Sequence, residues 1–439
     1  MNNVAIIGLG YVGLTLATVM AENGFRVYGI ERRKDVVDLT NKGIPHFSET
    51  GLEESLQRVI ESKNLSAHQK LDLSTKIMTY IITVGTPLDH EGNARLDMIK
   101  NATKEVADHM SDGALIILRS TVKIGTSRKI VSKILEKSGK KFSIAMCPER
   151  TLEGSALSEL RFLPQIIGSN SDEGFKLAEE IFSNITNTTI HVSNLETAEV
   201  IKLVDNSYRD VQFGFANEIA RVCEPFGISA NEVVMSGKNG YPRTNLAIPG
   251  LVGGPCLEKD PHILTQSLAD QGVTLDIIPA ARSVNERQPF ETVQFIFEEI
   301  ANRKIPENCK VAILGLAFKG VPETNDLRGS MSLKVIDAVI NKLPNIKLSL
   351  FDPVVSEDEI KSLYPSAKIE VSFKEAIKNS SVVLICTNHP KLSAMHPKNM
   401  LALMATTGFI YDYWNSFSSL NPHESNFSYY AVGNTNKNV

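Results

Sequence analysis

The stretch Val4-Ala-Ile-Ile-Gly-Leu-Gly-Tyr-Val-Gly13 decides the fold of the first part of this 439-residue chain. Its opening apolar run is typical of a buried parallel strand. The glycines then fit a tight strand-to-helix turn: Gly8 permits the turn, Gly10 lets a pyrophosphate approach the backbone, and Gly13 allows the helix to pack closely on the strand. A helix over residues 14–23 is predicted to follow, with its N-terminus facing the phosphates.

A second predicted strand, residues 26–30, ends in Glu31, which is placed to accept hydrogen bonds from a ribose 2′-hydroxyl. This acid favours NAD over NADP, whereas Arg32 and Arg33 could meet a 2′-phosphate and weaken the preference. A tight structural turn without a ligand is the alternative. The predicted cofactor-binding residues are Gly8, Gly10, Tyr11, Val12, Gly13, Glu31, Thr86 and Thr121.

Three further strand-like runs each end in polar or small residues. The runs are residues 77–84, 114–118 and 142–146, and their tails are Gly85-Thr-Pro87, Arg119-Ser-Thr121 and Cys147-Pro-Glu-Arg150. Because ligands bind at the carboxyl ends of parallel strands, these tails predict the rim of the nicotinamide site.

The last third of the sequence repeats the plan of the first domain. The strand-like runs there are residues 310–314, 348–351, 381–386 and 409–412. The first is followed by Gly315-Leu-Ala-Phe-Lys-Gly320, a relaxed GxAxxG version of the first turn, and Lys319 and Arg328 beside it could bind phosphates or a base. A structural domain without a ligand is the alternative. The tail after Phe427 is expected to be loosely ordered.

Between these regions, residues 196–224 have the apolar periodicity of a long helix. Lys202 and Asn206 are four residues apart and therefore share one of its faces, although such a pair is also common on a solvated surface. The sequence thus predicts an α/β protein with two Rossmann-like doubly wound domains joined by a central helical domain. The predicted boundaries are 1–192 for the NAD-binding domain, 193–296 for the helical domain, where we expect a homodimer to form, and 297–439 for the C-terminal domain.

Composition and charge argue against several classes of function. A net charge of −4 disfavours binding to nucleic acid or to a membrane surface. We find no window of about 20 uninterrupted apolar residues that would span a membrane. The five cysteines are far apart, without CxxC or metal-ligand spacing, which indicates a reduced, cytoplasmic setting and no metal site.

The stretch Gly250-Leu-Val-Gly-Gly-Pro-Cys-Leu-Glu-Lys-Asp260 places Cys256 after two glycines and before a Lys-Asp pair. A thiol attacks well only as the thiolate, and Lys202 or a backbone nest around Gly253-Gly254 could lower its pKa. Together with a nicotinamide cofactor, a nucleophilic cysteine points to oxidation beyond an aldehyde, through a thioester, to an acid. An inert core cysteine is the alternative, and this interpretation applies to the other four cysteines.

Seven motifs in this order resemble those of the UDP-glucose/GDP-mannose dehydrogenase family, from Val4 to about Asn415. They are GLGYVG, VGTP, RSTV, CPERTLEG, IKLVDNSYRD, GGPCLEKD and GLAFKGVPETNDLRGS. The resemblance implies oxidation of the C6 primary alcohol of a nucleotide sugar to a carboxylate, with two NAD reduced per turnover. It also implies that Cys256 attacks the C6 aldehyde, that Lys202 stabilises the developing oxyanion or assists proton transfer, and that Asn206 donates to the same oxygen.

The resemblance further implies a hydrolytic step, in which Asp260 and Thr121 bind a water that Glu153 activates. Glu149 would contact the sugar or its catalytic neighbours. Arg243 would reach into a neighbouring subunit's site, so that the dimer would be functional. The predicted substrate-binding residues are Glu149, Arg150, Lys202, Asn206, Arg243, Gly253, Lys319 and Arg328.

Two motifs favour an N-acetylhexosamine substrate. Cys147-Pro-Glu-Arg150 and the helix around residues 206–210 resemble the branch that oxidises UDP-N-acetylmannosamine or UDP-N-acetylglucosamine. Pro255 before the cysteine and Lys259 after it resemble instead the UDP-glucose and GDP-mannose enzymes, whose substrates are the alternatives. The product acid would feed synthesis of a capsule or another surface polysaccharide.

Two other classes of protein stay open. A two-electron hydroxyacid dehydrogenase would also combine an NAD domain, a helical domain and a helical lysine, but it would have no use for Cys256 or for a second nucleotide-binding domain. A sensor or scaffold with an inactive site would bind NAD without turnover. The six predicted catalytic residues, present together, argue against this second class. They are Cys256, Lys202, Asn206, Asp260, Glu153 and Thr121.

Overall fold

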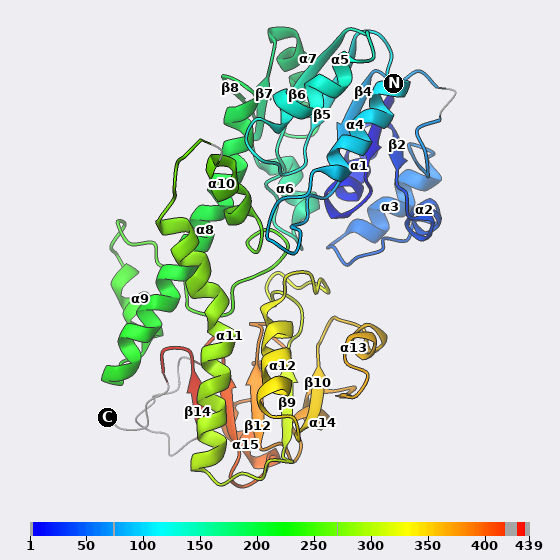
Figure 1. The fold of residues 1–439 in the computed structure, drawn as a ribbon. Helices are drawn as coiled ribbons and strands as arrows, with labels where there is room; N and C mark the ends of the chain where they lie inside the picture. The colour runs from blue at the N-terminus through cyan, green and yellow to red at the C-terminus, as the bar shows by residue number, and fades with distance from the viewer. Residues whose placement is uncertain (1–2, 73–74, 270, 418–427, 435–439) are drawn as a thin grey trace. The chain divides into compact units, whose positions relative to one another are not determined.

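The computed structural model describes residues 3–72, 75–269, 271–417 and 428–434. The chain divides into two compact units, each built around its own β-sheet (Figure 1). Unit 1 comprises residues 1–206 and 259–274, and unit 2 comprises residues 207–258 and 275–439. The predicted α/β class, with two Rossmann-like sheets and helices between them in sequence, is confirmed. Both units take residues from the predicted central domain, and the boundaries given for that domain stay a prediction.

Unit 1 contains an eight-stranded sheet in the order β3-β2-β1-β4-β5-β6-β7-β8. Its strands are β1 (Asn3–Ile7), β2 (Arg26–Ile30), β3 (Leu65–His68), β4 (Thr79–Ile82), β5 (Ala114–Leu118), β6 (Phe142–Met146), β7 (Gln165–Ser169) and β8 (Thr189–Val192). Neighbouring strands run parallel except β6 and β7, which are antiparallel. The order of connection reverses between β1 and β4, and such a reversal is where doubly wound sheets bind their ligands.

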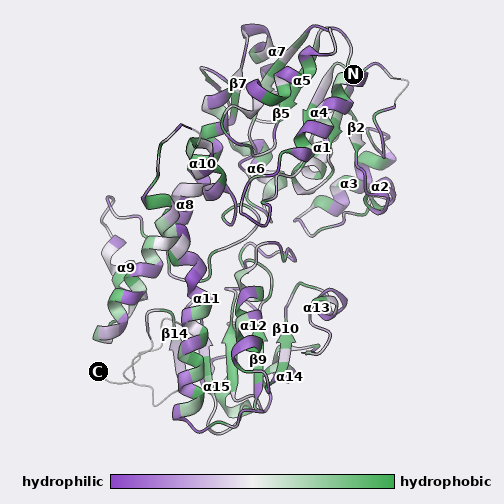
Figure 2. Cartoon of the chain, viewed as in Figure 1, coloured by the Kyte–Doolittle hydropathy of each residue, from purple (hydrophilic) through white to green (hydrophobic). Residues whose placement is uncertain are grey.

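Both faces of this sheet are covered, which explains the unbroken apolar runs in its strands. Val4 and Ile6 pack into one buried cluster, whereas Ala5 and Ile7 pack into another on the opposite face. The helices of unit 1 are α1 (Tyr11–Glu22), α2 (Lys34–Asn41), α3 (Leu52–Glu61), α4 (Asp97–His109), a π-helix (Ser127–Ser132), α5 (Lys133–Glu136), α6 (Ala156–Phe162), α7 (Asp172–Phe182) and α10 (Asp260–Ala269). The helices mix polar and apolar residues, and the strands are mostly apolar (Figure 2).

Unit 2 contains a six-stranded parallel sheet in the order β11-β10-β9-β12-β13-β14. Its strands are β9 (Lys310–Leu314), β10 (Lys347–Phe351), β11 (Lys368–Ile369), β12 (Val382–Ile385), β13 (Phe409–Asp412) and β14 (Tyr429–Ala431). The remaining helices are α8 (Leu195–Cys223), which passes from unit 1 into unit 2, a 3-10 helix (Glu224–Phe226), α9 (Ala230–Lys238), α11 (Ile277–Asn302), α12 (Met331–Lys342), α13 (Glu357–Leu363), α14 (Phe373–Ile377) and α15 (Pro397–Leu403).

The expectation of a loosely ordered tail after Phe427 is wrong for residues 428–434. Strand β14 pairs with β13, and the buried Tyr430 donates a hydrogen bond to Glu299 (2.7 Å). The aromatic side chain therefore anchors this strand to α11. Residues 435–439, with their asparagines, lie outside the described residues.

The turn after β9 begins like the turn of the first domain, but a helix does not follow at once. The N–H of Leu316 donates to Asp352 (2.6 Å) as that of Leu9 donates to Glu31 (3.0 Å). The next helix, α12, begins only at Met331, and residues 316–330 form a loop. Gly320 packs against the backbone of His389, and a Cβ on this glycine would lie 2.2 Å from the backbone nitrogen of His389. Pro322, two residues later, has no N–H with which to extend a helix. The GxAxxG stretch therefore keeps the start of the predicted turn, whereas the helix after it begins only at Met331.

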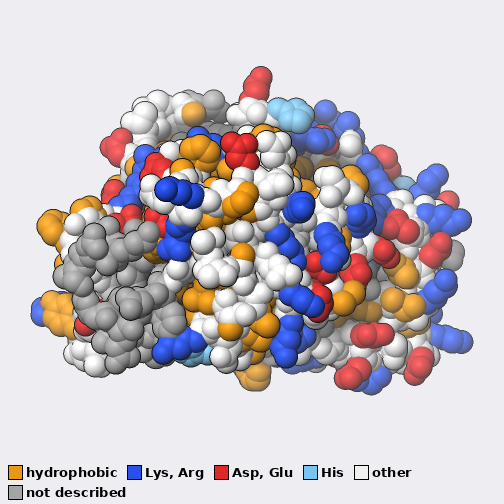
Figure 3. Space-filling model, turned by 90° about the horizontal axis from the view of Figure 1, so that it is seen from below, with side chains coloured by type: hydrophobic (Ala, Val, Ile, Leu, Met, Phe, Trp, Pro, Cys, Tyr) orange, Lys and Arg blue, Asp and Glu red, His pale blue; other side chains and the backbone are white. Residues whose placement is uncertain are grey.

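Among the described residues, no helix combines the length and the apolar character that crossing a bilayer requires. In the same residues, no group of His, Cys, Asp and Glu side chains could bind a metal ion. Acidic and basic side chains are mixed with hydrophobic ones over the face of the molecule drawn in Figure 3.

Candidate active site

The turn after β1 has the geometry that a dinucleotide requires. Gly8 has a φ of +99°, and a Cβ on Gly13 would lie 1.8 Å from the carbonyl oxygen of Gly8, so only glycine permits this approach of helix to turn. Beside Gly10 there is open space. Helix α1 begins at the next residue, Tyr11, three residues earlier than predicted, and no described side chain caps it. Its first N–H groups are therefore available to phosphate oxygens.

Glu31 supports this turn from the end of β2. Its carboxylate accepts hydrogen bonds from the N–H groups of Leu9 (3.0 Å) and Arg33 (3.0 Å). The guanidinium of Arg33 forms an ion pair with Asp35 on the surface. It is therefore bound to a carboxylate of this chain and not held ready for a 2′-phosphate. An acid at the ribose position and an arginine already paired favour NAD over NADP.

The ends of β4 and β5 are joined by their own side chains. Thr86 is buried, and its hydroxyl donates to the carbonyl oxygen of Thr121 (2.6 Å). Farther along the segment that follows Thr121, the N–H groups of Gly125 and Ser127 donate to the buried carboxylate of Glu199. Glu199 lies on α8, three residues before Lys202. These bonds fix α8 beside the carboxyl edge of the sheet in unit 1.

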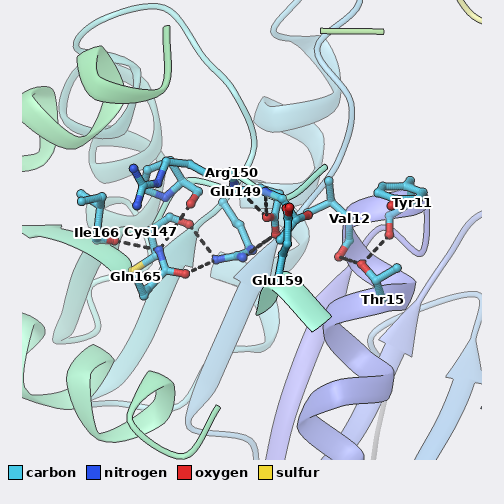
Figure 4. A network of polar contacts seen from close by, with 12 residues as sticks. Tyr11, Val12, Thr15, Cys147, Glu149, Arg150, Glu159, Gln165 and Ile166 are labelled. Atoms are coloured by element: carbon cyan, nitrogen blue, oxygen red, sulfur yellow. Dashed lines mark hydrogen bonds and ion pairs between the residues drawn. The ribbon is translucent and has the colours of Figure 1, made fainter. Parts of the chain in front are cut away.

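Glu149 lies in a buried polar network beyond β5 and β6 (Figure 4). Arg119 donates to Glu149 (2.9 Å), to the carbonyl oxygen of Cys147 (3.1 Å) and to Gln165 (2.7 Å). Because β7 runs antiparallel to β6, its first residue, Gln165, lies at the edge where β5 and β6 end. The network thus joins three strand ends around one carboxylate.

The surroundings of Glu149 keep it ionised. Burial on its own would raise the pKa of this carboxyl, but the positive charge of Arg119, the N–H of Thr151 and the charge of Lys202 outweigh burial and leave the pKa below its usual range. The pKa of the neighbouring Cys147 is shifted in the opposite direction, because burial raises the pKa of its thiol to about 12. Cys147 is therefore a neutral core residue, as predicted.

Lys202, Asn206 and Asp260 form the second half of the site in unit 1. Lys202 and Asn206 are 7% and 6% exposed, so the interpretation of this pair as a solvated surface is wrong. The side-chain amide of Asn206 donates to Asp260 (2.6 Å), and the ammonium of Lys259 contacts the other oxygen of the same buried carboxylate (2.8 Å). Helix α10, which begins at Asp260, also accepts a hydrogen bond at Gln266 from the N–H of Ala94 (3.0 Å).

Cys256 belongs to unit 2, and all five cysteines lie in the described part of the chain. Cys256 is exposed and the other four are buried. The glycines before it are required by close contacts: Gly254 has a φ of +94°, and its N–H donates to the carbonyl oxygen of Gly329 (2.7 Å). A Cβ on Gly254 would lie 2.5 Å from the ring of Phe318. The cysteine loop therefore packs directly on residues 316–330 of the C-terminal domain.

A buried arginine of α11 fixes this loop on both sides of the cysteine. Arg282 donates to the carbonyl oxygens of Val252 (2.9 Å) and Leu257 (3.0 Å) and to the carboxylate of Asp210 (2.7 Å). The loop thus presents its thiol to solvent on a rigid support.

Four further predicted residues have contacts of their own, and the N–H of one of them, Arg150, also donates to Glu149 (2.8 Å). In unit 1, Arg150 donates to the carbonyl oxygen of Pro164 (2.8 Å). In unit 2, the exposed Arg243 lies over the ring of Tyr241 (4.8 Å from the centroid), the Lys319 ammonium lies over Phe318 (5.2 Å), and Arg328 forms an ion pair with Asp326.

Three residues of the site were missed by the sequence analysis, and a fourth, Arg119, was placed only in the predicted rim of the nicotinamide site. Arg119 had a signal, because a charged residue directly follows a buried strand. Gln165 had none, because its place depends on the antiparallel direction of β7. Glu199 and Arg282 lie within long helices and are identified only by the partners to which they bond. These four residues are support for the loops that carry the predicted site.

The fold and the two clusters define an oxidoreductase that takes NAD as its cofactor. Family models agree over most of the chain. The NAD binding domain of the UDP-glucose/GDP-mannose dehydrogenase family matches residues 2–186, its central domain residues 196–287, and its UDP binding domain residues 312–419. The chain belongs to the UDP-glucose/GDP-mannose dehydrogenase family and is thus a nucleotide-sugar dehydrogenase.

Relatives in this family extend over nearly the whole chain. A UDP-N-acetyl-D-mannosamine dehydrogenase of Pyrococcus horikoshii is 31% identical over 400 residues, which are 90% of this chain and 91% of the relative. One of Campylobacter jejuni is 31% identical over 404 residues, which are 88% and 95% of the two chains. The solved structure of the Pyrococcus horikoshii enzyme aligns with a TM-score of 0.89 at 29% identity, covering 98% of this chain and 99% of that one. A UDP-glucose dehydrogenase structure from Pyrobaculum islandicum aligns with a TM-score of 0.87 at 25% identity, covering 99% and 98%.

Proposed function

We propose that this chain oxidises the C6 alcohol of a UDP-N-acetylhexosamine to the uronic acid, with UDP-N-acetylmannosamine as the first candidate and UDP-N-acetylglucosamine as the second. The names of its relatives and the Cys147-Pro-Glu-Arg150 motif support this choice of sugar. The observation that carries the proposal is Cys256, an exposed thiol on a loop that Arg282 fixes from within. The product acid would enter the synthesis of a surface polysaccharide.

The oxidations would use Lys202, Asn206 and Cys256 together with the cofactor. When bound at the turn of residues 8–13, NAD supplies the acceptor for two electrons in each of two oxidations. Lys202 and Asn206 would bind the C6 oxygen, and Lys202 would stabilise its negative charge as it develops. After the first oxidation, the Cys256 thiolate bonds to the aldehyde carbon and the oxygen takes up a proton, which gives a thiohemiacetal. The second oxidation removes that proton and also the hydrogen on C6 with its electron pair, which leaves a thioester on the sulfur.

Hydrolysis of the thioester would complete the reaction. Glu153 takes a proton from a water molecule bound by Asp260 and Thr121, and the water oxygen bonds to C6. The bond between C6 and the sulfur of Cys256 then breaks, its electron pair returns to the sulfur as thiolate, and the carboxylic acid leaves. Asn206 and Lys259, which contact the Asp260 carboxylate (2.6 and 2.8 Å), orient it for this task.

We also propose that the chain forms a homodimer through α8. Tyr208, Phe215 and Val222 recur at seven-residue intervals along this helix and are 58%, 49% and 56% exposed. Such an apolar stripe is typical of a helix that packs against another helix. Arg243, exposed in the same unit, would then contribute to the partner's site.

The test is the number of NADH molecules formed per sugar consumed. The chain and its Cys256→Ala variant would be assayed with UDP-N-acetylmannosamine, UDP-N-acetylglucosamine, UDP-glucose and GDP-mannose. We expect two NADH per UDP-N-acetylhexosamine and no uronic acid from the variant. One NADH per sugar, or uronic acid formed without Cys256, would instead indicate an oxidation that stops at the aldehyde or a route that avoids the thioester.

UDP-glucose is the alternative to the two N-acetylated sugars. Pro255 and Lys259 flank the cysteine as in the UDP-glucose branch, and Lys259 contacts Asp260 (2.8 Å). The structural likeness to a UDP-glucose dehydrogenase supports the same alternative. A kcat/KM for UDP-glucose above that for both N-acetylated sugars would favour it.

A further inference from the structure

The loop between β6 and α6, residues 147–155, carries two of the proposed site residues, Glu149 and Glu153. Four of its backbone N–H groups, those of residues 150, 151, 152 and 154, bond to carboxylates. Glu149 accepts hydrogen bonds from the N–H groups of the two residues that follow it (2.8 and 2.7 Å). Glu159 accepts one from the N–H of Leu152 (2.6 Å). The conformation of the loop is therefore set by acidic side chains.

A third carboxylate, that of Glu49, binds the end of the loop from a distant part of the sequence. Glu49 follows α2 and precedes α3, and it is buried. One of its oxygens accepts from the N–H of Gly154 (2.7 Å), the residue after Glu153, and the other accepts from the N–H of Ala156 (2.9 Å). Charge-assisted bonds of this kind are the stronger hydrogen bonds in proteins.

These two bonds cap helix α6 with a residue outside the helix. The N-cap residue itself, Ser155, makes no capping hydrogen bond with its side chain, although serine is a favoured residue there. Glu49 supplies the acceptor instead. A cap alone would not require a buried glutamate 107 residues away in sequence, and Glu49 has a further partner that a cap does not need.

That partner is Tyr11, the first residue of α1. The Tyr11 hydroxyl donates to Glu49, and its ring packs on Phe47 with 5.0 Å between centroids. Burial raises the pKa of Tyr11, and the bond to Glu49 and the negative charges of Glu49 and Glu153 raise it further. The N–H of Gly154, the residue after Glu153, lies 3.3 Å from the Tyr11 hydroxyl, so Glu153 is close to the cofactor turn.

We propose that Glu49 is a positioning residue for Glu153: by fixing the backbone directly after Glu153, and by bonding to Tyr11, it aims the Glu153 carboxylate at the water that hydrolyses the thioester. The proposal rests on the proposed role of Glu153. A general base works only within hydrogen-bond reach of the proton that it removes, and a displacement of about 1 Å can cost on the order of 100-fold in rate. Glu49 itself touches neither the thioester nor the water.

The test follows the acyl-enzyme by mass. In Glu49→Gln, an amide N–H₂ replaces one of the two carboxylate oxygens and faces a backbone N–H. In Glu49→Asp, the carboxylate keeps its charge, but the side chain is one methylene too short to reach both N–H groups. During turnover with UDP-N-acetylmannosamine, we expect intact-protein mass spectrometry to find the acyl adduct on Cys256 in both variants. We also expect the steady-state rate of NADH formation to fall by about 10- to 100-fold after an initial burst, with KM for the sugar falling in step, so that kcat/KM changes little.

Two further variants separate the possible outcomes. Glu153→Gln should accumulate the same adduct, and if it does not, the proposed role of Glu153 is wrong and the present inference falls with it. If the acyl adduct accumulates in Glu153→Gln but not in Glu49 variants that fold, the proposed role of Glu49 is wrong while that of Glu153 stands. The control Ser171→Ala removes the N-cap hydrogen bond of another helix, α7. It should lower Tm, but no acyl adduct should accumulate on Cys256. Loss of the fold in both Glu49 variants would also contradict the proposal, because Glu49 would then serve folding and not the position of Glu153.

Discussion

Individual glycines of the cofactor turn have separate tasks, and alanine substitutions should distinguish them. In Gly13→Ala, the new Cβ would meet the carbonyl oxygen of Gly8 at 1.8 Å, so we expect a loss of about 3 kcal/mol in the free energy of unfolding. Gly10 has an extended backbone and open space beside it. Gly10→Ala should therefore stay within about 0.5 kcal/mol of the parent and yet bind NAD about tenfold more weakly, because its methyl group occupies the room of the pyrophosphate.

Urea unfolding and calorimetric titration with NAD measure these two effects. The pair is its own control, since both substitutions add one methyl group to the same turn. A stable Gly13→Ala protein, or unchanged NAD affinity in Gly10→Ala, would contradict the geometry of the turn.

Residues in apolar runs and glycine turns could be predicted from the sequence, whereas their partners could not. The places of Glu149, Lys202 and Cys256 after a strand, on a helix and in a glycine loop followed from local pattern. Arg119 and Glu49 are different, because their roles depend on bonds to residues far away in the sequence. Such bonds have no local periodicity or spacing by which they could be recognised.

Among the helices and strands, too, some could be predicted from local sequence and others could not. Strands β5, β6, β9 and β13 have the predicted bounds, because each is a short apolar run buried on both faces. Strand β8 was missed, since its residues Thr189–Val192 are largely polar and partly exposed. Strand β14 was missed because it is three residues long and follows a polar segment. Strand β7 was also missed, and its antiparallel direction could not have been predicted, because a strand carries no sequence signal for its direction.

At this scale, the cysteine loop depends on α8 and α11 through Arg282. Arg282→Met would leave the Asp210 carboxylate buried without its arginine, and we expect unfolding to become easier by about 3–5 kcal/mol. Adding Asp210→Asn should restore part of this loss, because the uncompensated charge is then gone. Urea unfolding of the two single variants and the double variant gives the coupling energy. Additive losses would mean that the ion pair does not support the loop.

At the scale of the whole molecule, we expect the α8 stripe to be covered by a second copy. Light scattering coupled to gel filtration should give the mass of two chains for the parent. Phe215→Glu combined with Val222→Glu places two charges in the stripe and should shift the mass to one chain. The control is Val371→Glu, which changes a more exposed apolar residue (75%) elsewhere in unit 2. A dimer that survives the double substitution would assign the interface to another surface.

The discontinuity of unit 1 has a consequence for how the protein is made. Its helix α10 comes from residues that the ribosome translates only after all of Ser207–Glu258, a part of the other unit. Asp260 and Gln266 on that helix bond to Asn206 and Ala94. A nascent chain that ends at Asn206 therefore lacks these contacts, and the dinucleotide-binding unit can complete its folding only after translation has passed the cysteine loop.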